Sequence, residues 1–220
     1  MLPKLIVLNG RREIILIIDY GMGNLHSILH KLGKAGIQAI VSSKIEDIAQ
    51  ADKLILPGVG AFGAGMENLK ARGLLPVLNR KVLEEKTPIL GICLGMQLFA
   101  KSSEEGDAEG LGWIDGEIKR FHFDLESEKN IRIPHVGWNT IQPQRESPLL
   151  TNVSSDQRFY FTHSYHIVAN NPADVLATTC YGYEFVSAIQ HGNIIGVQFH
   201  PEKSHRRGII IYKNFVDDIR

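Results

Sequence analysis

Short apolar runs alternate with segments of helical periodicity along the first half of the chain. Continuous aliphatic stretches bounded by glycine, proline or polar residues predict buried parallel strands over residues 13–18, 38–41, 53–56 and 89–92. Apolar residues at helical spacing predict helices over residues 25–32, 66–72, 74–85 and 94–100. Strands that alternate with helices predict an α/β fold with an open, mostly parallel twisted sheet and helices on both of its faces.

Polar residues at the predicted helix starts indicate where two of the helices begin. Asn24 directly precedes the first helical stretch and is expected to be its N-cap. Ser43 and Glu46 have the spacing of a capping box, which predicts a short helix after the second strand.

The second half of the chain contains shorter apolar segments separated by polar loops. They predict strands over residues 116–123, 131–133, 159–161 and 175–179, and a hairpin that joins residues 186–190 to 194–199. These strands are expected to form a smaller antiparallel region beside the parallel sheet. A closing helix is predicted over residues 206–219, with Tyr212, Phe215, Val216 and Ile219 on one face.

Composition limits the location and the partners of the protein. Lysine plus arginine and aspartate plus glutamate total 24 each, so no charge bias favours nucleic acid or an acidic membrane. The apolar run near residue 5 is too short for a signal peptide, and no run reaches the ~18 residues of a membrane helix. Cys93 and Cys180 are the only cysteines, so the sequence has no disulfide framework. This predicts a cytoplasmic protein.

Cys93 stands at the junction of a predicted strand and a predicted helix. Gly91 and Gly95 flank it, a pattern typical of a nucleophile elbow with cysteine in place of serine. At such an elbow the strand and the helix come too close together for a side chain, which accounts for both glycines. The helix N-terminus favours a thiolate, and the amide of Leu94 is a candidate oxyanion donor. Taken alone, the motif is equally compatible with a buried structural cysteine.

His200 and Glu202 supply the groups that a thiolate nucleophile needs. An apolar strand runs directly into His200, and Glu202 follows two positions later, so both side chains can leave the strand end on the same side. A lone histidine at a strand end is more often structural. In combination with Cys93, the pattern favours a catalytic triad of Cys93, His200 and Glu202.

The two motifs together resemble those of the class I glutamine amidotransferases, which use a Cys-His-Glu triad. Gly-Ile-Cys-Leu-Gly-Met-Gln at residues 91–97 and Val-Gln-Phe-His-Pro-Glu at residues 197–202 carry the resemblance. It implies a flavodoxin-like fold and a glutaminase in which Cys93 is the nucleophile, His200 shuttles the proton and Glu202 orients His200. Gln97 is implied to belong to the glutamine pocket.

The same resemblance assigns further residues to the binding of glutamine. It places an oxyanion strand at Gly58, Val59 and Gly60, where the glycines allow the Val59 peptide to rotate its amide toward the tetrahedral intermediate. In the polar segment 102–106, which would otherwise be a solvated loop, it places a glutamine-binding carboxylate at Glu105. The amino-acid end of glutamine is assigned to the backbone of His163, Ser164 and Tyr165.

Four segments narrow the resemblance to the glutaminase subunits of imidazole glycerol phosphate synthases: residues 19–25, 56–62, 134–139 and 159–165. Thr162 departs from the pattern, which has an aliphatic residue there. The resemblance covers about residues 14–219 and implies a heterodimer with a (β/α)8-barrel cyclase subunit that receives the ammonia through a sealed passage. Members of this group begin near Ile14, so residues 14–220 are expected to form one domain and residues 1–13 an extension. The candidates for the partner surface are Asn24, Trp138, Tyr160 and Lys203.

Neither a cofactor nor a metal is predicted. Gly-Met-Gly at residues 21–23 lacks the third glycine of a dinucleotide fingerprint. The remaining histidines lack metal-ligand spacing, so structural or surface roles are expected for His122, His135, His163, His166 and His205.

Three alternative functions stay open. A paralogous glutaminase that serves another acceptor, such as a surface sugar, would keep the whole triad. A hydrolase of the same fold with another substrate fits Gln97 and the Pro-Gly-Val-Gly loop less well. A non-catalytic amidotransferase-like module that only binds a partner would not need Cys93, His200 and Glu202.

Overall fold

The arrangement of strands and helices is described from a computed structural model, which covers residues 7–8, 11–123 and 131–219. The strands are β1 (Val7–Leu8), β2 (Arg11–Arg12), β3 (Ile15–Ile18), β4 (Ile40–Ser42), β5 (Lys53–Gly58), β6 (Ile89–Cys93), β7 (Ser102–Ser103), β8 (Ala108–Glu109), β9 (Gly116–Arg120), β10 (His135–Thr140), β11 (Gln142–Pro143), β12 (Arg158–His163), β13 (Tyr165–Ala169), β14 (Val175–Tyr181), β15 (Tyr183–His191) and β16 (Ile194–Val197). The helices are α1 (Leu25–Lys34), α2 (Ile45–Gln50), α3 (Phe62–Ala71), α4 (Leu75–Asn79), α5 (Leu94–Gln97) and α6 (His205–Asp218), with a π-helical segment η1 (Arg80–Glu84) and 3₁₀ turns η2 (Pro148–Leu150), η3 (Pro172–Asp174) and η4 (Pro201–Lys203).

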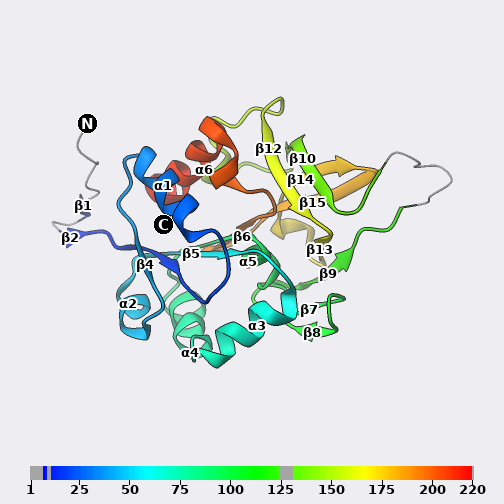
Figure 1. The fold of residues 1–220 in the computed structure, drawn as a ribbon. Helices are drawn as coiled ribbons and strands as arrows, with labels where there is room; N and C mark the ends of the chain where they lie inside the picture. Colours follow the sequence, from blue (N-terminus) through cyan, green and yellow to red (C-terminus); the bar gives the residue numbers. More distant parts are fainter. Residues whose placement is uncertain (1–6, 9–10, 124–130, 220) are drawn as a thin grey trace.

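The large sheet combines a parallel and an antiparallel part. Its strand order is β4-β3-β5-β6-β16-β15-β13-β9-β7-β8; off this path, β14 pairs with β15, and β11 pairs with β14. All neighbours from β4 to β16 are parallel, so the carboxyl ends of β5, β6 and β16 lie side by side. The hairpin of β15 and β16 joins the antiparallel part to this region, as the turn at residues 191–193 predicts. A separate antiparallel pair, β10 and β12, lies on the same side of the sheet as α6 (Figure 1).

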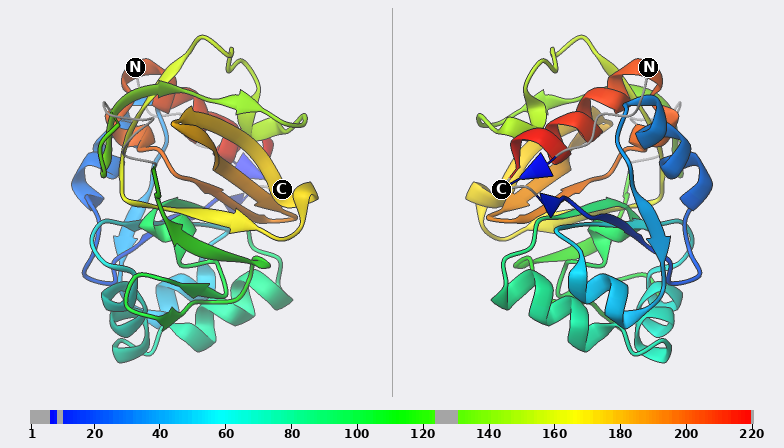
Figure 2. Two further views of the ribbon diagram at one scale, coloured as in Figure 1. Left: turned by 90° about the vertical axis from the view of Figure 1, so that its right-hand side faces the viewer. Right: turned by 90° about the vertical axis from the view of Figure 1, so that its left-hand side faces the viewer.

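Alternate residues of the central strands point to opposite faces of the sheet and form two cores. On one face Ile15 and Ile17 of β3 pack in the core that α1 and α6 cover, and on the other Leu16 and Ile18 pack in the core under α2, α3 and α4. Figure 1 shows these two helical layers, and Figure 2 shows them from either side. Helices on both faces of a parallel sheet confirm the predicted fold class.

A buried lysine ties α6 to the centre of the sheet. Lys53 in β5 is 2% exposed, and its ammonium group lies 3.3 Å from the carboxylate of Glu13. The same group donates to the carbonyl oxygens of Phe215 and Val216 near the C-terminal end of α6. A cation at this end of a helix compensates the unpaired carbonyl groups there.

Helix boundaries agree with the sequence at α1 and differ at three other helices. The Asn24 carboxamide accepts a hydrogen bond from the Ser27 amide, which confirms the predicted N-cap. The capping box at Ser43 is wrong: α2 begins after Lys44, and the hydroxyl of Ser42 bonds to the Lys44 amide instead. The third helix begins at residue 62 rather than 66, and α5 ends at residue 97 because the chain tightens there into i→i+3 turns.

Strand predictions in the second half are less accurate. The strand predicted over residues 131–133 is absent, and β10 instead follows Pro134, which lacks the N–H group for a strand ladder. The sequence did not predict β7, β8, β11 or β13. β7, β8 and β11 have two residues each, and β13 has five and lies between β15 and β9. All four depend on their partners in the sheet.

Part of the predicted N-terminal extension is described. Within residues 1–13, β1 pairs with β2 in antiparallel fashion, whereas residues 1–6 and 9–10 lie outside the described residues. The division into an extension at residues 1–13 and one domain at residues 14–220 stays a prediction. In the described part of the chain, no helix has both the length and the apolar content needed to cross a membrane.

Candidate active site

Cys93 stands at the sharp turn between β6 and α5. Its backbone has φ 54° and ψ −111°, a combination that residues with a side chain rarely adopt. A Cβ atom on Gly95 would lie 1.8 Å from the carbonyl oxygen of Leu56, and one on Gly91 would lie 2.7 Å from the amide nitrogen of Met96. The strand, the turn and the helix are therefore as close as the elbow motif predicts, and this packing holds the strained backbone of Cys93 in place.

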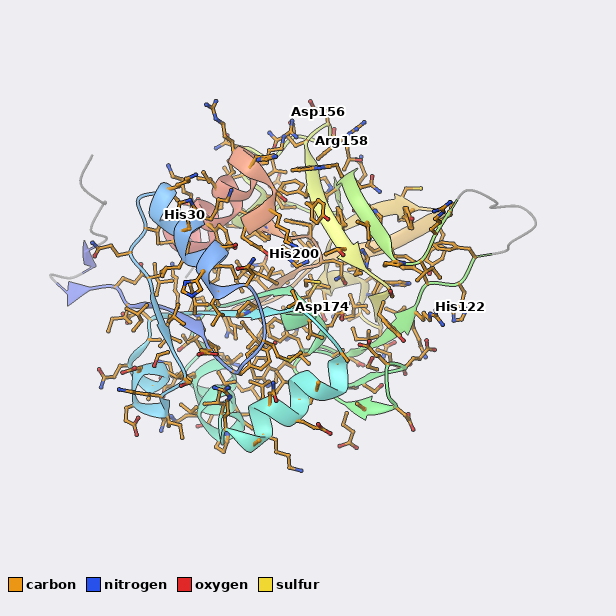
Figure 3. The ribbon with its side chains drawn as sticks, in the orientation of Figure 1. His30, His122, Asp156, Arg158, Asp174 and His200 are labelled. Atoms are coloured by element: carbon orange, nitrogen blue, oxygen red, sulfur yellow. The ribbon has the colours of Figure 1, made fainter. Side chains whose placement is uncertain are left out.

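His200 and Glu202 follow β16, the parallel neighbour of β6. Nδ1 of His200 donates a hydrogen bond to Oε1 of Glu202 over 2.7 Å, and the two side chains are 1% and 2% exposed. Figure 3 shows His200 near the centre of the molecule, while His30 and His122 lie toward its periphery. The adjacent ends of β6 and β16 thus place a buried imidazole and carboxylate next to the elbow.

Two acidic groups determine the charge of His200. Burial by itself lowers the pKa of the imidazole, but the Cys93 thiolate and the Glu202 carboxylate outweigh it and raise the pKa of His200 to about 10. Nε2 of His200 has no hydrogen-bond partner among the described residues. At neutral pH the site therefore holds a protonated imidazole whose second N–H group is available to a reacting molecule.

A cavity of about 320 Å³ opens beside this group. Most of the predicted site residues share its lining, which consists of Val59, Gly60, Cys93, Leu94, Gln97, Glu105, Pro134, Thr162, His163, Ser164, Tyr165 and His200. Gly58 and Glu202 are not part of this lining but adjoin Val59 and His200, which are. Asn24, Trp138, Tyr160 and Lys203 do not line the cavity. A larger cavity near η2 and the end of α6 contains none of the predicted residues. The smaller cavity is therefore the candidate active site.

The loop after β5 borders the cavity. Gly58 pairs with Cys93 across the neighbouring strands, and a Cβ atom at Gly58 would lie 2.7 Å from the hydroxyl of Tyr20. Gly60 has φ +111°, which favours glycine, and the side chain of Val59 between them is 43% exposed. The amide of Leu94, as the first residue of α5, has no partner within the helix. The oxyanion roles of Val59 and Leu94 stay predictions.

Glu105 lies closer to secondary structure than the sequence suggests. The segment expected to be a solvated loop contains β7, and the Glu105 amide donates to the hydroxyl of Ser103. One carboxylate oxygen of Glu105 accepts a hydrogen bond from the Phe62 amide over 2.8 Å. This bond caps α3, which explains the early start of that helix. The carboxylate also lines the cavity and can meet a cationic group there.

Sequence reasoning missed three residues around the candidate nucleophile: Pro134, Thr162 and Gln198. Pro134 lines the cavity, and the carbonyl oxygen of Thr162 lies 3.9 Å from the sulfur of Cys93. Because the backbone makes this contact, the departure from the family pattern at Thr162 leaves it intact. Gln198 donates to the same sulfur over 3.6 Å. The available signal was its place two residues before His200, since alternate residues of an extended segment share a side.

A family match covers most of the chain. Residues 16–219 match the family described as "Glutamine amidotransferase class-I". The chain belongs to the class I glutamine amidotransferases. This finding confirms the resemblance that the Cys93 and His200 motifs indicate.

Relatives of this amidotransferase share much of its sequence. "Imidazole glycerol phosphate synthase subunit HisH 2" of Pseudomonas aeruginosa is 47% identical over 203 residues, which is 92% of this chain and 98% of the relative. The protein of the same name from Methanococcus maripaludis is 48% identical over 202 residues, again 92% and 98%. Both relatives place the chain on the HisH branch of the family.

Solved structures share the fold of this amidotransferase. PurLQS from Thermotoga maritima superposes with a TM-score of 0.67 at 18% identity, over 93% of this chain and 98% of that chain. A glutamine amidotransferase from the same organism gives 0.60 at 17% identity, over 93% and 84%. At these identities the likeness establishes the fold alone.

Three of the four residues predicted for a partner surface gather near His200 of the amidotransferase. The rings of Trp138 and His205 stack at 5.1 Å, Tyr160 meets Trp138 edge-on at 5.8 Å, and the ammonium of Lys203 lies 5.4 Å from the Tyr160 ring centre. We call these four residues the aromatic surface cluster. The backbone amide of His200 donates to the carbonyl of Tyr160 over 2.8 Å, so the cluster borders the candidate active site. Asn24 takes no part in these contacts.

Two buried histidines of the amidotransferase lie at or next to the candidate cavity in a fixed tautomeric state. Nδ1 of His163 lies 2.8 Å from the carbonyl oxygen of Tyr165, which can only accept, so this nitrogen carries the proton. Nε2 of His163 therefore accepts the N–H of His135 Nδ1 over 3.1 Å. Burial lowers the pKa of His135 to about 4 and that of His163 to about 3. Both rings are neutral, and their structural role agrees with the sequence prediction.

Acid is expected to destabilise the fold through this pair. A free imidazole titrates near pH 6.5, so between pH 6.5 and about 4 the unfolded chain binds more protons than the folded chain. Stability is complete above this window and falls as the pH decreases through it, by up to about 1.4 kcal/mol per pH unit for each histidine. Urea unfolding from pH 7 to pH 4 measures this slope. His135→Asn should make it shallower, and His30→Asn, at an exposed position, should not; equal slopes in the parent and in His135→Asn would contradict the prediction.

Among the described residues, no group of three or more histidine, cysteine, aspartate or glutamate side chains is placed to hold a metal ion.

Proposed function

We propose that this chain hydrolyses the side-chain amide of glutamine to glutamate and ammonia. The observation that carries the proposal is the buried His200–Glu202 pair, which stands with the strained elbow cysteine at one cavity. Membership of the class I glutamine amidotransferases supports the choice of substrate. This one cavity brings together a nucleophile, a proton donor and a carboxylate that can bind the ammonium end of an amino acid.

The thiolate of Cys93 attacks the γ-carbonyl carbon of glutamine. The carbonyl electrons move onto its oxygen, which the amides of Val59 and Leu94 stabilise as an oxyanion. Collapse of this intermediate breaks the C–N bond, and the Nε2 proton of His200 passes to the departing ammonia. His200, now neutral, takes a proton from water, and the resulting hydroxide releases glutamate from the thioester. Glu202 holds the imidazole in the required orientation and stabilises its charged form.

Residues around the cavity hold the glutamine for this attack. Glu105 is placed to pair with the α-ammonium group, because its carboxylate lines the cavity. Gln97 is nearly buried, and its amide bonds to the carbonyl of Tyr165, which fixes one wall. The remaining contacts to the amino-acid end are assigned to Gly58, Gly60, His163, Ser164 and Tyr165.

The ammonia is proposed to pass to a (β/α)8-barrel cyclase subunit. The names of the relatives describe them as subunits of imidazole glycerol phosphate synthase, which supports a heterodimer in histidine biosynthesis. The cyclase would use the ammonia to form imidazole glycerol phosphate and aminoimidazole carboxamide ribonucleotide. The aromatic surface cluster, with Trp138 40% exposed, is the proposed docking surface, and Asn24 is a further candidate.

A second acceptor is the alternative. Both relatives carry the numeral 2 in their names, whereas a relative from Leptospira borgpetersenii is named HisH without a numeral. A paralogous glutaminase that supplies ammonia to a different acceptor, such as a surface sugar, would need the same triad and the same cavity. Cys93 and Cys180 are both free, and either enzyme is proposed to work in the cytoplasm, where thiols stay reduced.

Glutamate release from glutamine tests both the glutaminase reaction and the delivery of ammonia to the cyclase. It is measured with the chain alone, with a cyclase subunit, and with the cyclase loaded with its ribonucleotide substrate. Strong stimulation by the loaded cyclase is expected, because ammonia released without an acceptor is protonated and lost. Reaction of Cys93 with a glutamine-analogue alkylator without stimulation would favour the second acceptor. Absence of both glutamate release and alkylation would refute the glutaminase.

Glu202→Gln tests whether the negative charge of Glu202 raises the pKa of His200. Glutamine keeps the shape and an acceptor oxygen but removes the negative charge that helps to raise the pKa of His200. That pKa should therefore move down from about 10, and the basic limb of the pH profile should move to lower pH. Glutamate release at neutral pH is expected to fall about 10²-fold. A pH profile identical to that of the parent would show that Glu202 does not act on His200.

A further inference from the structure

Gln198 is a fully buried glutamine in contact with the candidate nucleophile. It lies just beyond β16, is 0% exposed, and its backbone amide is held by the carbonyl of Ser187. Its side-chain nitrogen lies 3.6 Å from the sulfur of Cys93. Its side-chain oxygen accepts a hydrogen bond from the amide of Gln97 over 3.1 Å. Both ends of a buried carboxamide are thus used, one of them on the thiol.

A chain of hydrogen bonds fixes the orientation of this carboxamide. The carbonyl oxygen of Tyr165 can only accept, so the Gln97 group that lies 2.9 Å from it must be the NH₂ group. The same NH₂ group faces Gln198, which must present its oxygen in return. The NH₂ group of Gln198 is therefore the end that meets Cys93. The carbonyl group of Tyr165 therefore fixes the orientation of Gln97, which in turn makes Gln198 present a donor to the thiol.

We propose that Gln198 is a positioning residue that donates an N–H group to the Cys93 thiolate and holds its sulfur at the cavity. The proposal rests on the proposed function in taking Cys93 as the nucleophile. A donor to the charged form of a group favours that form. His200 supplies a positive charge to the thiolate, and Gln198 supplies a neutral hydrogen-bond donor to the same sulfur.

This donor has a specific use during the reaction. The sulfur is negatively charged before it attacks glutamine and again when it leaves the thioester, by which time His200 has taken a proton from water. Gln198 donates to the sulfur in both states, in addition to the charge of the imidazolium. A glutamine that only filled space would influence packing but not the ionisation of the thiol.

The test measures the rate of alkylation of Cys93 by iodoacetamide as a function of pH in the full chain. Peptide mass spectrometry separates Cys93 from Cys180, whose exposed thiol is an internal reference. Gln198→Met keeps the side-chain length without a donor. Gln198→Glu keeps the acceptor for Gln97 and places a negative oxygen toward the sulfur. The matched control is Gln144→Met, because the side-chain amide of Gln144 bonds only to Gln142 and Thr178 in the described structure.

The pH midpoint of Cys93 alkylation should move up by about one pH unit in Gln198→Met and by more in Gln198→Glu. The Cys180 midpoint and the Gln144→Met profile should stay with the parent. An unchanged Cys93 midpoint in a folded Gln198 variant, or a shift shared by Cys180, would overturn the proposal. Unfolding transitions identify which variants are folded, and Gln198→Glu provides the test if Gln198→Met does not fold.

Glutamate release separates this inference from the proposed function. If the midpoints shift as expected and the parent releases no glutamate from glutamine, the proposed function is refuted and the contact of Gln198 with the thiolate stands. If the parent is an active glutaminase and the midpoints stay unchanged, only the role of Gln198 is refuted.

Discussion

Replacing Cys93 by alanine is expected to abolish glutamate release, with a loss of at least about 10⁴-fold. Alanine offers no nucleophile, and no other thiol lines the cavity of the described structure. Water would have to attack the amide directly, without the covalent step that divides the reaction. Cys93→Ser should be almost as inactive, because a hydroxyl ionises far less readily than a thiol.

The fold should survive both changes at this position. Alanine is smaller than cysteine and adds no contact, so the unfolding transition is expected to stay close to that of the parent. Cys180→Ala is the control, since Cys180 is exposed and does not line the cavity; it should keep full activity. Measurable glutamate release by Cys93→Ala above the uncatalysed rate would remove Cys93 as the nucleophile.

Replacing Gly95 by alanine is expected to cause the largest loss of stability of any change considered. The added methyl group would lie 1.8 Å from the carbonyl oxygen of Leu56 and 2.8 Å from its carbon. Both are backbone atoms of β5, in the centre of the parallel sheet, and cannot rotate away. Relief requires α5 to move off the sheet, which we expect to cost about 3 kcal/mol or more. Urea or thermal unfolding measures this loss, as a decrease in Tm of about 6–12 °C for a chain of this size.

Gly33→Ala is the matched control for this loss. A Cβ atom at Gly33 in α1 would have no neighbour within 4 Å. The substitution should therefore stabilise the helix by up to about 1 kcal/mol, because alanine loses less backbone freedom than glycine on folding. Equal stability of Gly95→Ala and the parent would mean that α5 does not pack against β5 as described.

Local sequence patterns were sufficient for most elements that surround the site. Strands β3, β5 and β6 were recognisable from their continuous aliphatic runs, because a strand that is buried on both faces needs apolar residues at successive positions. The Cys93 elbow was recognisable because its two glycines report the close approach of strand and helix. The fold class followed from the alternation of strand-like apolar runs with segments of helical periodicity. Both patterns can be recognised within a few consecutive residues.

The predicted boundaries of helices and strands were wrong where a residue distant in sequence determines them. The start of α3 depends on the carboxylate of Glu105, which lies 43 positions away in sequence. The strands β7, β8, β11 and β13 depend on neighbouring strands that complete their hydrogen bonds. No pattern within these segments predicts such partners.

The sequence by itself determined the types of chemical group in the candidate site and the local turn that presents the cysteine. Tertiary structure decided which of those groups meet. Parallel pairing of β16 with β6 brings His200 beside Cys93, and the contact between Gln198 and Cys93 joins residues 105 positions apart. Such contacts depend on the order of strands in the sheet and on packing across it. A strand order is a property of the whole chain, because it minimises exposed apolar surface and unpaired backbone groups together.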